Sequence, residues 1–70
     1  MKHFVLLHNL IMMTQANVMN SVQPWFEAEL VGIRTQLTIM VMGFKENDKI
    51  TDYQETKLLS LIQNITTPEE

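Results

Sequence analysis

The chain has 70 residues, so it is long enough for one small domain, spanning residues 1–70, and too short for two. It contains no cysteine, which excludes disulfides and thiolate metal sites. Its net charge is −3 and its five basic residues are dispersed, which argues against binding of nucleic acid through a basic face. A domain this small buries only about 60% of the surface that its unfolded chain exposes. Because small domains without disulfides often recover stability by association, we expect a homodimer or a larger homo-oligomer.

The first part of the chain is almost free of charge. Residues 3–26 contain no Asp, Glu, Lys or Arg, although a solvated helix face normally carries such residues. Apolar residues surround a helical wheel drawn over residues 3–20, which predicts a helix buried against the rest of the chain, a second copy or a membrane. We take Leu7 and Ile11 as candidates for an interface with a second copy or a partner. The three apolar stripes are Phe4, Leu7, Ile11 and Val18; Val5, Met12, Ala16 and Met19; and Leu6, Leu10 and Met13.

A signal peptide or membrane anchor is the alternative interpretation of this segment. Lys2 followed by the apolar residues 4–7 is typical of a signal peptide, but His8 and Asn9 interrupt the apolar run. A membrane-spanning helix needs about 20 mostly apolar residues, whereas this segment also contains several Asn and Gln residues. We therefore expect a soluble, cytoplasmic protein.

Pro24 predicts a break before a second helix over residues 24–42, because proline suits the first turn of a helix and disfavours helical geometry at the residue before it. Gly43 is the expected left-handed residue that ends this helix. Its apolar residues recur in steps of four, three, four and three, which predicts a continuous seam facing the core. That seam comprises Phe26, Leu30, Ile33, Leu37 and Met40.

A second set of residues runs along the opposite side of the same predicted helix. These residues are small or weakly apolar, so they would allow another helix to approach closely, and we predict that a second subunit packs there. They are Ala28, Val31, Gly32, Thr35, Ile39 and Met42. Trp25 and Phe26 lie at the start of this helix, where aromatic residues either anchor an interface or fasten the first helix onto the second. The sequence leaves both roles open.

Residues 44–51 are predicted to form a polar connector that is rich in charged residues. A third helix is predicted over residues 52–65. Thr51 and Gln54 fit a capping box, and Asp52 with Glu55 offers a competing box one residue later. The apolar stripe of this helix is Tyr53, Leu58, Leu61, Ile62 and Ile65. The sequence thus predicts an all-α fold: a long helix, a proline break and a helix–loop–helix, packed as a small bundle that oligomerisation stabilises.

No catalytic constellation is found, so we expect a protein without enzymatic activity. There is no glycine-rich phosphate loop, and His3 and His8 point in different directions on a helix. His8 and Met12 lie four residues apart and suggest a soft-metal site, but the ligand set is incomplete and we predict neither a metal nor a cofactor. The six methionines are interpreted as core residues in preference to an adaptable binding groove.

Residues 26–67 combine the second helix with Met42-Gly43, a polar linker containing Ile50-Thr51, the stretch Lys57-Leu58-Leu59-Ser60-Leu61-Ile62, and Ile65-Thr66-Thr67. This pattern resembles the helix–loop–helix of the YmgB/AriR family, small enterobacterial regulators of biofilm formation and acid resistance that are also called connector proteins. The linker here is several residues longer, and the uncharged first helix does not belong to that pattern. The resemblance implies an all-helical dimer that acts by protein contact, with DNA as a further option.

We therefore predict a small helical regulator or adaptor that dimerises and binds another protein. The first alternative is a structural subunit or cochaperone of a bacterial or phage assembly, in which the first helix is buried only in the complex. The second is a peripheral membrane peptide. It is less favoured because helices at the lipid interface usually carry Lys or Arg on their polar face, and only Lys2 is available here.

Overall fold

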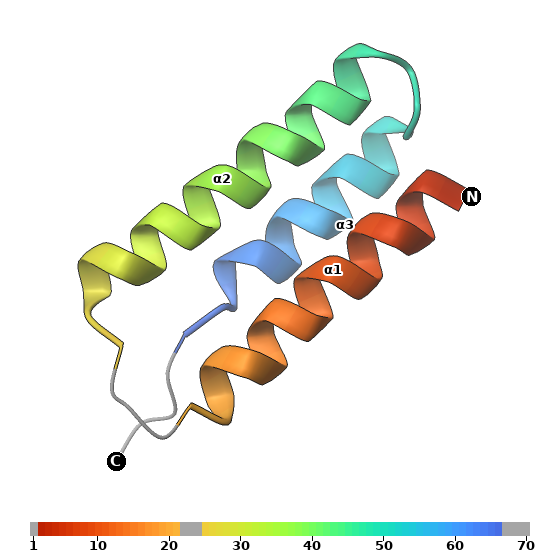
Figure 1. The fold of residues 1–70 in the computed structure, drawn as a ribbon. Coiled ribbons are helices and arrows are strands. Elements are labelled where there is room, and N and C mark those ends of the chain that lie inside the picture. The colour runs from red at the N-terminus through yellow and green to blue at the C-terminus, as the bar shows by residue number, and fades with distance from the viewer. Residues whose placement is uncertain (1, 22–24, 67–70) are drawn as a thin grey trace.

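The computed structural model describes residues 2–21 and 25–66, and within these ranges the chain forms three α-helices and no strand (Figure 1). The helices are α1 (Lys2–Met19), α2 (Glu27–Glu46) and α3 (Asp52–Gln63). The all-α prediction is confirmed, and α1 and α3 begin and end within two residues of the predicted limits. The predicted break at Pro24 lies outside the described residues.

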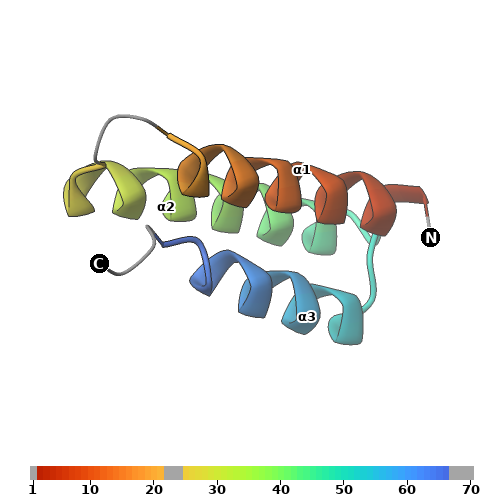
Figure 2. The ribbon, with the colours of Figure 1, turned by 90° about the horizontal axis from the view of Figure 1, so that it is seen from below.

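The helices run up, down and up, so that α2 is antiparallel to both α1 and α3 (Figure 1). α3 lies between α1 and α2 in Figure 1, and in the view turned by 90° it lies on one side of both (Figure 2). α3 makes most of the helix-to-helix contact, and α1 and α2 touch each other least. The Cα atoms span 39 × 19 × 13 Å, so the bundle is elongated and thin. In such a bundle each helix can turn only one stripe inward.

The core takes its α1 residues from the first of the three apolar stripes. Leu7, Ile11 and Val18 are buried and Phe4 packs partly buried beside them, whereas the other two stripes are largely exposed. The single chain buries only one side of α1, because three helices offer α1 only one direction in which to pack; burial of its other sides against a second copy or a membrane stays a prediction. The buried core consists of Leu7, Ile11, Val18, Leu30, Leu37, Val41, Ile50, Leu58, Ile62 and Ile65.

The inward seam of α2 agrees with the prediction in its middle and departs from it at both ends: Phe26, its first predicted member, is 73% exposed. Leu30 and Leu37 are buried, but Met40 is 41% exposed, and Val41 is buried in its place. A straight helix has 3.6 residues per turn, so a strict heptad pattern drifts about 20° per repeat away from a fixed direction. A step of four from Leu37 to Val41 corrects this drift and brings Phe44 against the core.

α2 ends at Glu46, one turn later than predicted, and Gly43 lies inside the helix without a positive φ. The left-handed residue is Asp48, with a φ of 57°. Its N–H donates to the carbonyl of Lys45 at 3.0 Å, and the N–H of Lys49 donates to the carbonyl of Phe44 at 2.9 Å. These two bonds form a Schellman motif, and an aspartate tolerates the left-handed position better than most residues. The predicted role of Gly43 as the helix cap is therefore wrong.

The position of Gly43 inside the last turn of α2 yields a stability prediction. A Cβ built at this residue meets no atom within 4 Å, and glycine is less favourable than alanine in a helix by about 1 kcal/mol. Gly43→Ala should therefore raise the free energy of unfolding by about 0.5–1 kcal/mol, as urea denaturation would measure. A loss of stability would show that position 43 requires glycine for a reason outside the single chain.

The start of α3 confirms the first of the two predicted capping boxes. The N–H of Gln54 donates to Thr51 Oγ1 at 3.1 Å, and the N–H of Thr51 donates to Gln54 Oε1 at 3.0 Å. Tyr53, which was assigned to the inward stripe, is 72% exposed because it lies in the first turn on the outer side. Lys45 and Asp52 form an ion pair of 2.9 Å between α2 and α3, and the Asp52 carboxylate raises the pKa of Lys45 by hydrogen bonding and by its charge.

Arg34 joins α2 to the chain that follows α3. Its Nη1 donates to the carbonyl of Ile65 at 2.7 Å, and its Nη2 pairs with Glu27 Oε1 at 2.6 Å. The Arg34 side chain is only 16% exposed, whereas that of Glu27 is 74% exposed. The guanidinium thus holds Ile65 in the core after α3 has ended.

Candidate interaction surfaces

The second set of residues predicted on this helix lies on α2, and all of its members are exposed. We call this set the α2 row; it consists of Ala28, Val31, Gly32, Thr35, Ile39 and Met42. The three large members are substantially exposed: Val31 is 47%, Ile39 65% and Met42 47% exposed. Between Arg34 and Lys45 the helix carries no charged residue, and apart from Arg34 the charged groups of α2 lie at its ends. Monomeric proteins rarely leave a contiguous apolar, uncharged strip uncovered. The row is therefore a candidate contact surface.

A shallow cavity of about 290 Å³ borders this row, with Gln63 of α3 on its far side. Its volume is at the lower limit of sites that bind small molecules, which range over roughly 300–1,000 Å³. Its size suits an inserted side chain better than a metabolite. The residues around it are Val31, Arg34, Thr35, Thr38, Ile39 and Gln63.

The two aromatic residues before α2 have different environments. Trp25 is partly buried and packs against the core, so it fastens the start of α2 to the bundle. Its indole Nε1 is buried and has no hydrogen-bond partner in the part of the chain that the structure describes. Phe26 is 73% exposed at the N-cap position of α2, where its own N–H donates to Glu29 Oε1 at 3.0 Å. Of the pair, Phe26 has the exposed ring.

The structure places Leu7 and Ile11 inside the single chain. Each is 1% exposed, so neither is available to a second subunit or a partner, and their assignment to an interface is wrong. They belong to the one α1 stripe that faces α3 and α2. The surface that α1 does offer was missed by sequence reasoning, which assumed that the whole helix was covered. We call this surface the α1 outer face; it contains Val5, Leu6, Leu10, Met12, Met13 and Met19.

The methionines lie on the surface, contrary to their interpretation as core residues. Every methionine of the described ranges is between 41% and 63% exposed: Met12, Met13, Met19, Met40 and Met42. An unbranched, polarisable side chain adapts to partners of different shape. Their exposure on both α1 and α2 favours the alternative interpretation, an adaptable binding surface.

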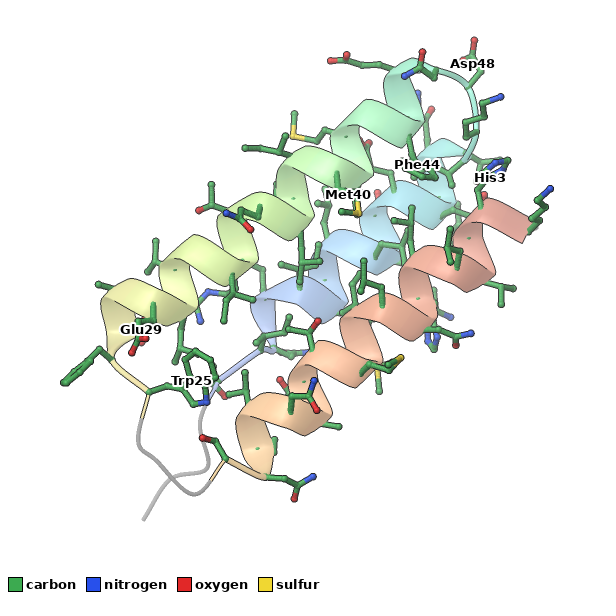
Figure 3. All side chains as sticks on the ribbon, in the orientation of Figure 1. His3, Trp25, Glu29, Met40, Phe44 and Asp48 are labelled. Carbon is green, nitrogen blue, oxygen red and sulfur yellow. The ribbon has the colours of Figure 1, made fainter. Side chains whose placement is uncertain are left out.

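Other cavities and aromatic contacts lie away from these two surfaces. One open cavity of about 190 Å³ lies where His3 and Phe44 meet edge to face, with ring centroids 5.7 Å apart, at the end of the bundle opposite Trp25 (Figure 3). His8 contacts Phe4, with ring centroids 5.9 Å apart. Over residues 2–21 and 25–66, no three His, Asp or Glu side chains gather closely enough to hold a metal ion. Within the same ranges no helix has both the length and the hydropathy to cross a membrane.

Comparison with known proteins adds no relative: no family model, no curated protein and no solved structure matches this chain. The α2 row and the α1 outer face are the structural features that bear on function.

Proposed function

We propose that this chain is a non-enzymatic, cytoplasmic helical adaptor or regulator that pairs with a second copy and acts by contact with another protein. The observation that carries the proposal is the exposure of large apolar side chains on two uncharged helix surfaces, the α2 row and the α1 outer face. Exposed large apolar side chains grouped on a helix surface are typical of sites of protein association. The regulatory part of the proposal rests on the resemblance of residues 26–67 to the YmgB/AriR family.

The two surfaces are suited to two different contacts. The α2 row holds small residues that permit close helix packing, so we assign it to the second copy. The α1 outer face is wider and richer in methionine, so we assign it to the other protein. It carries no fixed charge from residue 3 to residue 20, which selects for an uncharged, apolar helix or groove on the partner.

The strength of the self-association can be bounded. Full burial of a Val, Ile or Met side chain yields about 1.5–3 kcal/mol, and roughly half of each row side chain remains to be covered, so each adds about 1 kcal/mol. Each copy contributes three such side chains. The free energy gained by burying all six is comparable to the cost of association, which is about 4–15 kcal/mol. We therefore expect a dimer that dissociates on dilution.

A structural subunit of a larger assembly is the second candidate. The six exposed large residues of the α1 outer face favour it, because a surface this apolar is stable when it is permanently covered. In that case the isolated chain aggregates until its neighbour in the assembly is added.

The proposal is tested by placing one charge on the α2 row. Ile39 is 65% exposed, so Ile39→Glu leaves the core intact but puts a carboxylate into the interface. Sedimentation equilibrium at increasing concentration should show a monomer for this variant and a dimer for the wild type. Thr56→Glu is the matched control, because it adds the same charge to an exposed position of α3 and should leave the dimer unchanged. Equal masses for wild type and Ile39→Glu would contradict the assignment of the α2 row.

A further inference from the structure

All sulfur in this chain belongs to methionine, because the sequence has six methionines and no cysteine. The buried core that the structure describes consists of Leu, Ile and Val residues alone. Every methionine of residues 2–21 and 25–66 lies outside that core and is between 41% and 63% exposed. Since the reactivity of a side-chain sulfur follows its exposure, an oxidant reaches these methionines while the bundle is folded.

The exposed methionines are concentrated on the two candidate contact surfaces. Met12, Met13 and Met19 make up half of the α1 outer face and lie toward the C-terminal end of the helix. Met42 belongs to the α2 row, and Met40 belongs to neither surface. Oxidation at sulfur therefore changes both surfaces and leaves the described core unaltered.

The reaction of a methionine with hydrogen peroxide is a two-electron oxidation. The thioether sulfur attacks one peroxide oxygen, an S–O bond forms as the O–O bond breaks, and the other oxygen leaves as water after a proton transfer. The sulfoxide is polar and accepts hydrogen bonds, but an apolar contact surface offers it no donor. Burying its oxygen without a partner weakens a contact by about tenfold for each sulfoxide.

Building on the proposed function, we infer that oxidation of the methionines on the α1 outer face and the α2 row disrupts the contacts of both surfaces while the three-helix bundle stays folded. An exposed sulfoxide remains hydrated in the single chain, so it costs the fold little. The change is reversible, because methionine sulfoxide reductases return the sulfoxide to the thioether. Two thiols supply the electrons, and the oxygen leaves as water.

Limited treatment of the purified protein with hydrogen peroxide tests this inference. Peptide mass spectrometry should find sulfoxide at all the exposed methionines, and circular dichroism should show a cooperative thermal transition with a Tm close to that of the untreated protein. Light scattering should show that dimerisation requires a concentration about tenfold higher or more. Retention on a hydrophobic-interaction column should fall, and treatment with the reductases for both sulfoxide epimers should restore both properties.

Two leucine variants assign these effects to their residues. Met42→Leu removes the sulfur from the α2 row and keeps its apolar volume, so peroxide should no longer weaken the dimer. The triple variant Met12→Leu, Met13→Leu and Met19→Leu should keep its column retention after peroxide treatment and should still lose dimerisation. Both variants retain Met1, so an effect of peroxide at that residue would persist in both.

The contrary outcomes are distinguishable. Loss of the cooperative transition on oxidation would overturn the inference, because the fold would then depend on the unoxidised methionines. An unchanged dimer and unchanged retention of the folded, fully oxidised protein would also overturn it and would leave the proposed function intact. A single-chain mass before oxidation would overturn the proposed self-association, whereas a fall in retention that the triple variant abolishes would still support the inference for the α1 outer face.

Discussion

Replacing Leu37 with aspartate is expected to unfold the protein. Leu37 is 7% exposed in the middle of α2 and faces the core, so the substitution removes apolar contacts and buries a carboxylate without a partner. The combined cost is about 4 kcal/mol or more, whereas a domain of this length has a total stability of roughly 4–10 kcal/mol. Circular dichroism during a thermal scan should show loss of the cooperative transition or a large fall in Tm.

Lys45→Ala is the matched control for this experiment. Lys45 lies in the same helix but outside the core, and its pair with Asp52 is exposed to solvent, because the Asp52 side chain is 91% exposed. Exposed ion pairs contribute little to stability. The Lys45→Ala variant should therefore melt close to the wild type, and equal Tm values for the two variants would show that the core has been misplaced.

Arg34→Met is expected to cost about 2–3 kcal/mol of unfolding free energy. The guanidinium donates to the carbonyl of Ile65 at 2.7 Å, and Ile65 is fully buried, so the substitution removes a charged donor from a carbonyl beside the core. For a domain of this size the corresponding fall in Tm is roughly 10–20 °C. Methionine keeps much of the apolar stem, so the loss reports the hydrogen bond more than the packing.

Glu27→Gln separates this hydrogen bond from the ion pair. It weakens the contact between Arg34 and the exposed Glu27 and leaves the bond to Ile65 in place, so the change should stay within about 1 kcal/mol. An equal loss in both variants would contradict the view that Arg34 acts chiefly through Ile65.

The helices could be predicted because their signals are local. The capping box of Thr51 and Gln54 needs four consecutive residues, and the burial of Leu30 and Leu37 follows from their spacing alone. The end of α2 could not be located, because Gly43 offered a more obvious stop than Asp48. The contact between Arg34 and Ile65 spans 31 residues and leaves no pattern in the sequence.

The candidate surfaces were predictable only in part. On α2 the core seam and the row differ in side-chain size, so the sequence separated them, and all members of the row are exposed. On α1 no polar face marks the outside, because residues 3–20 carry no fixed charge. Three apolar stripes were therefore equivalent in the sequence, and only the packing of α1 against α3 decides that Leu7 and Ile11 face inward.

The central claim is that these exposed surfaces are covered by protein, beginning with a second copy of the chain. Light scattering on the purified protein in the absence of detergent tests it most directly, over a concentration series wide enough to observe dissociation. We expect the mass to rise with concentration toward twice the chain mass of 8.2 kDa. A mass that stays at 8.2 kDa throughout, or aggregation that only lipid vesicles relieve, would contradict it.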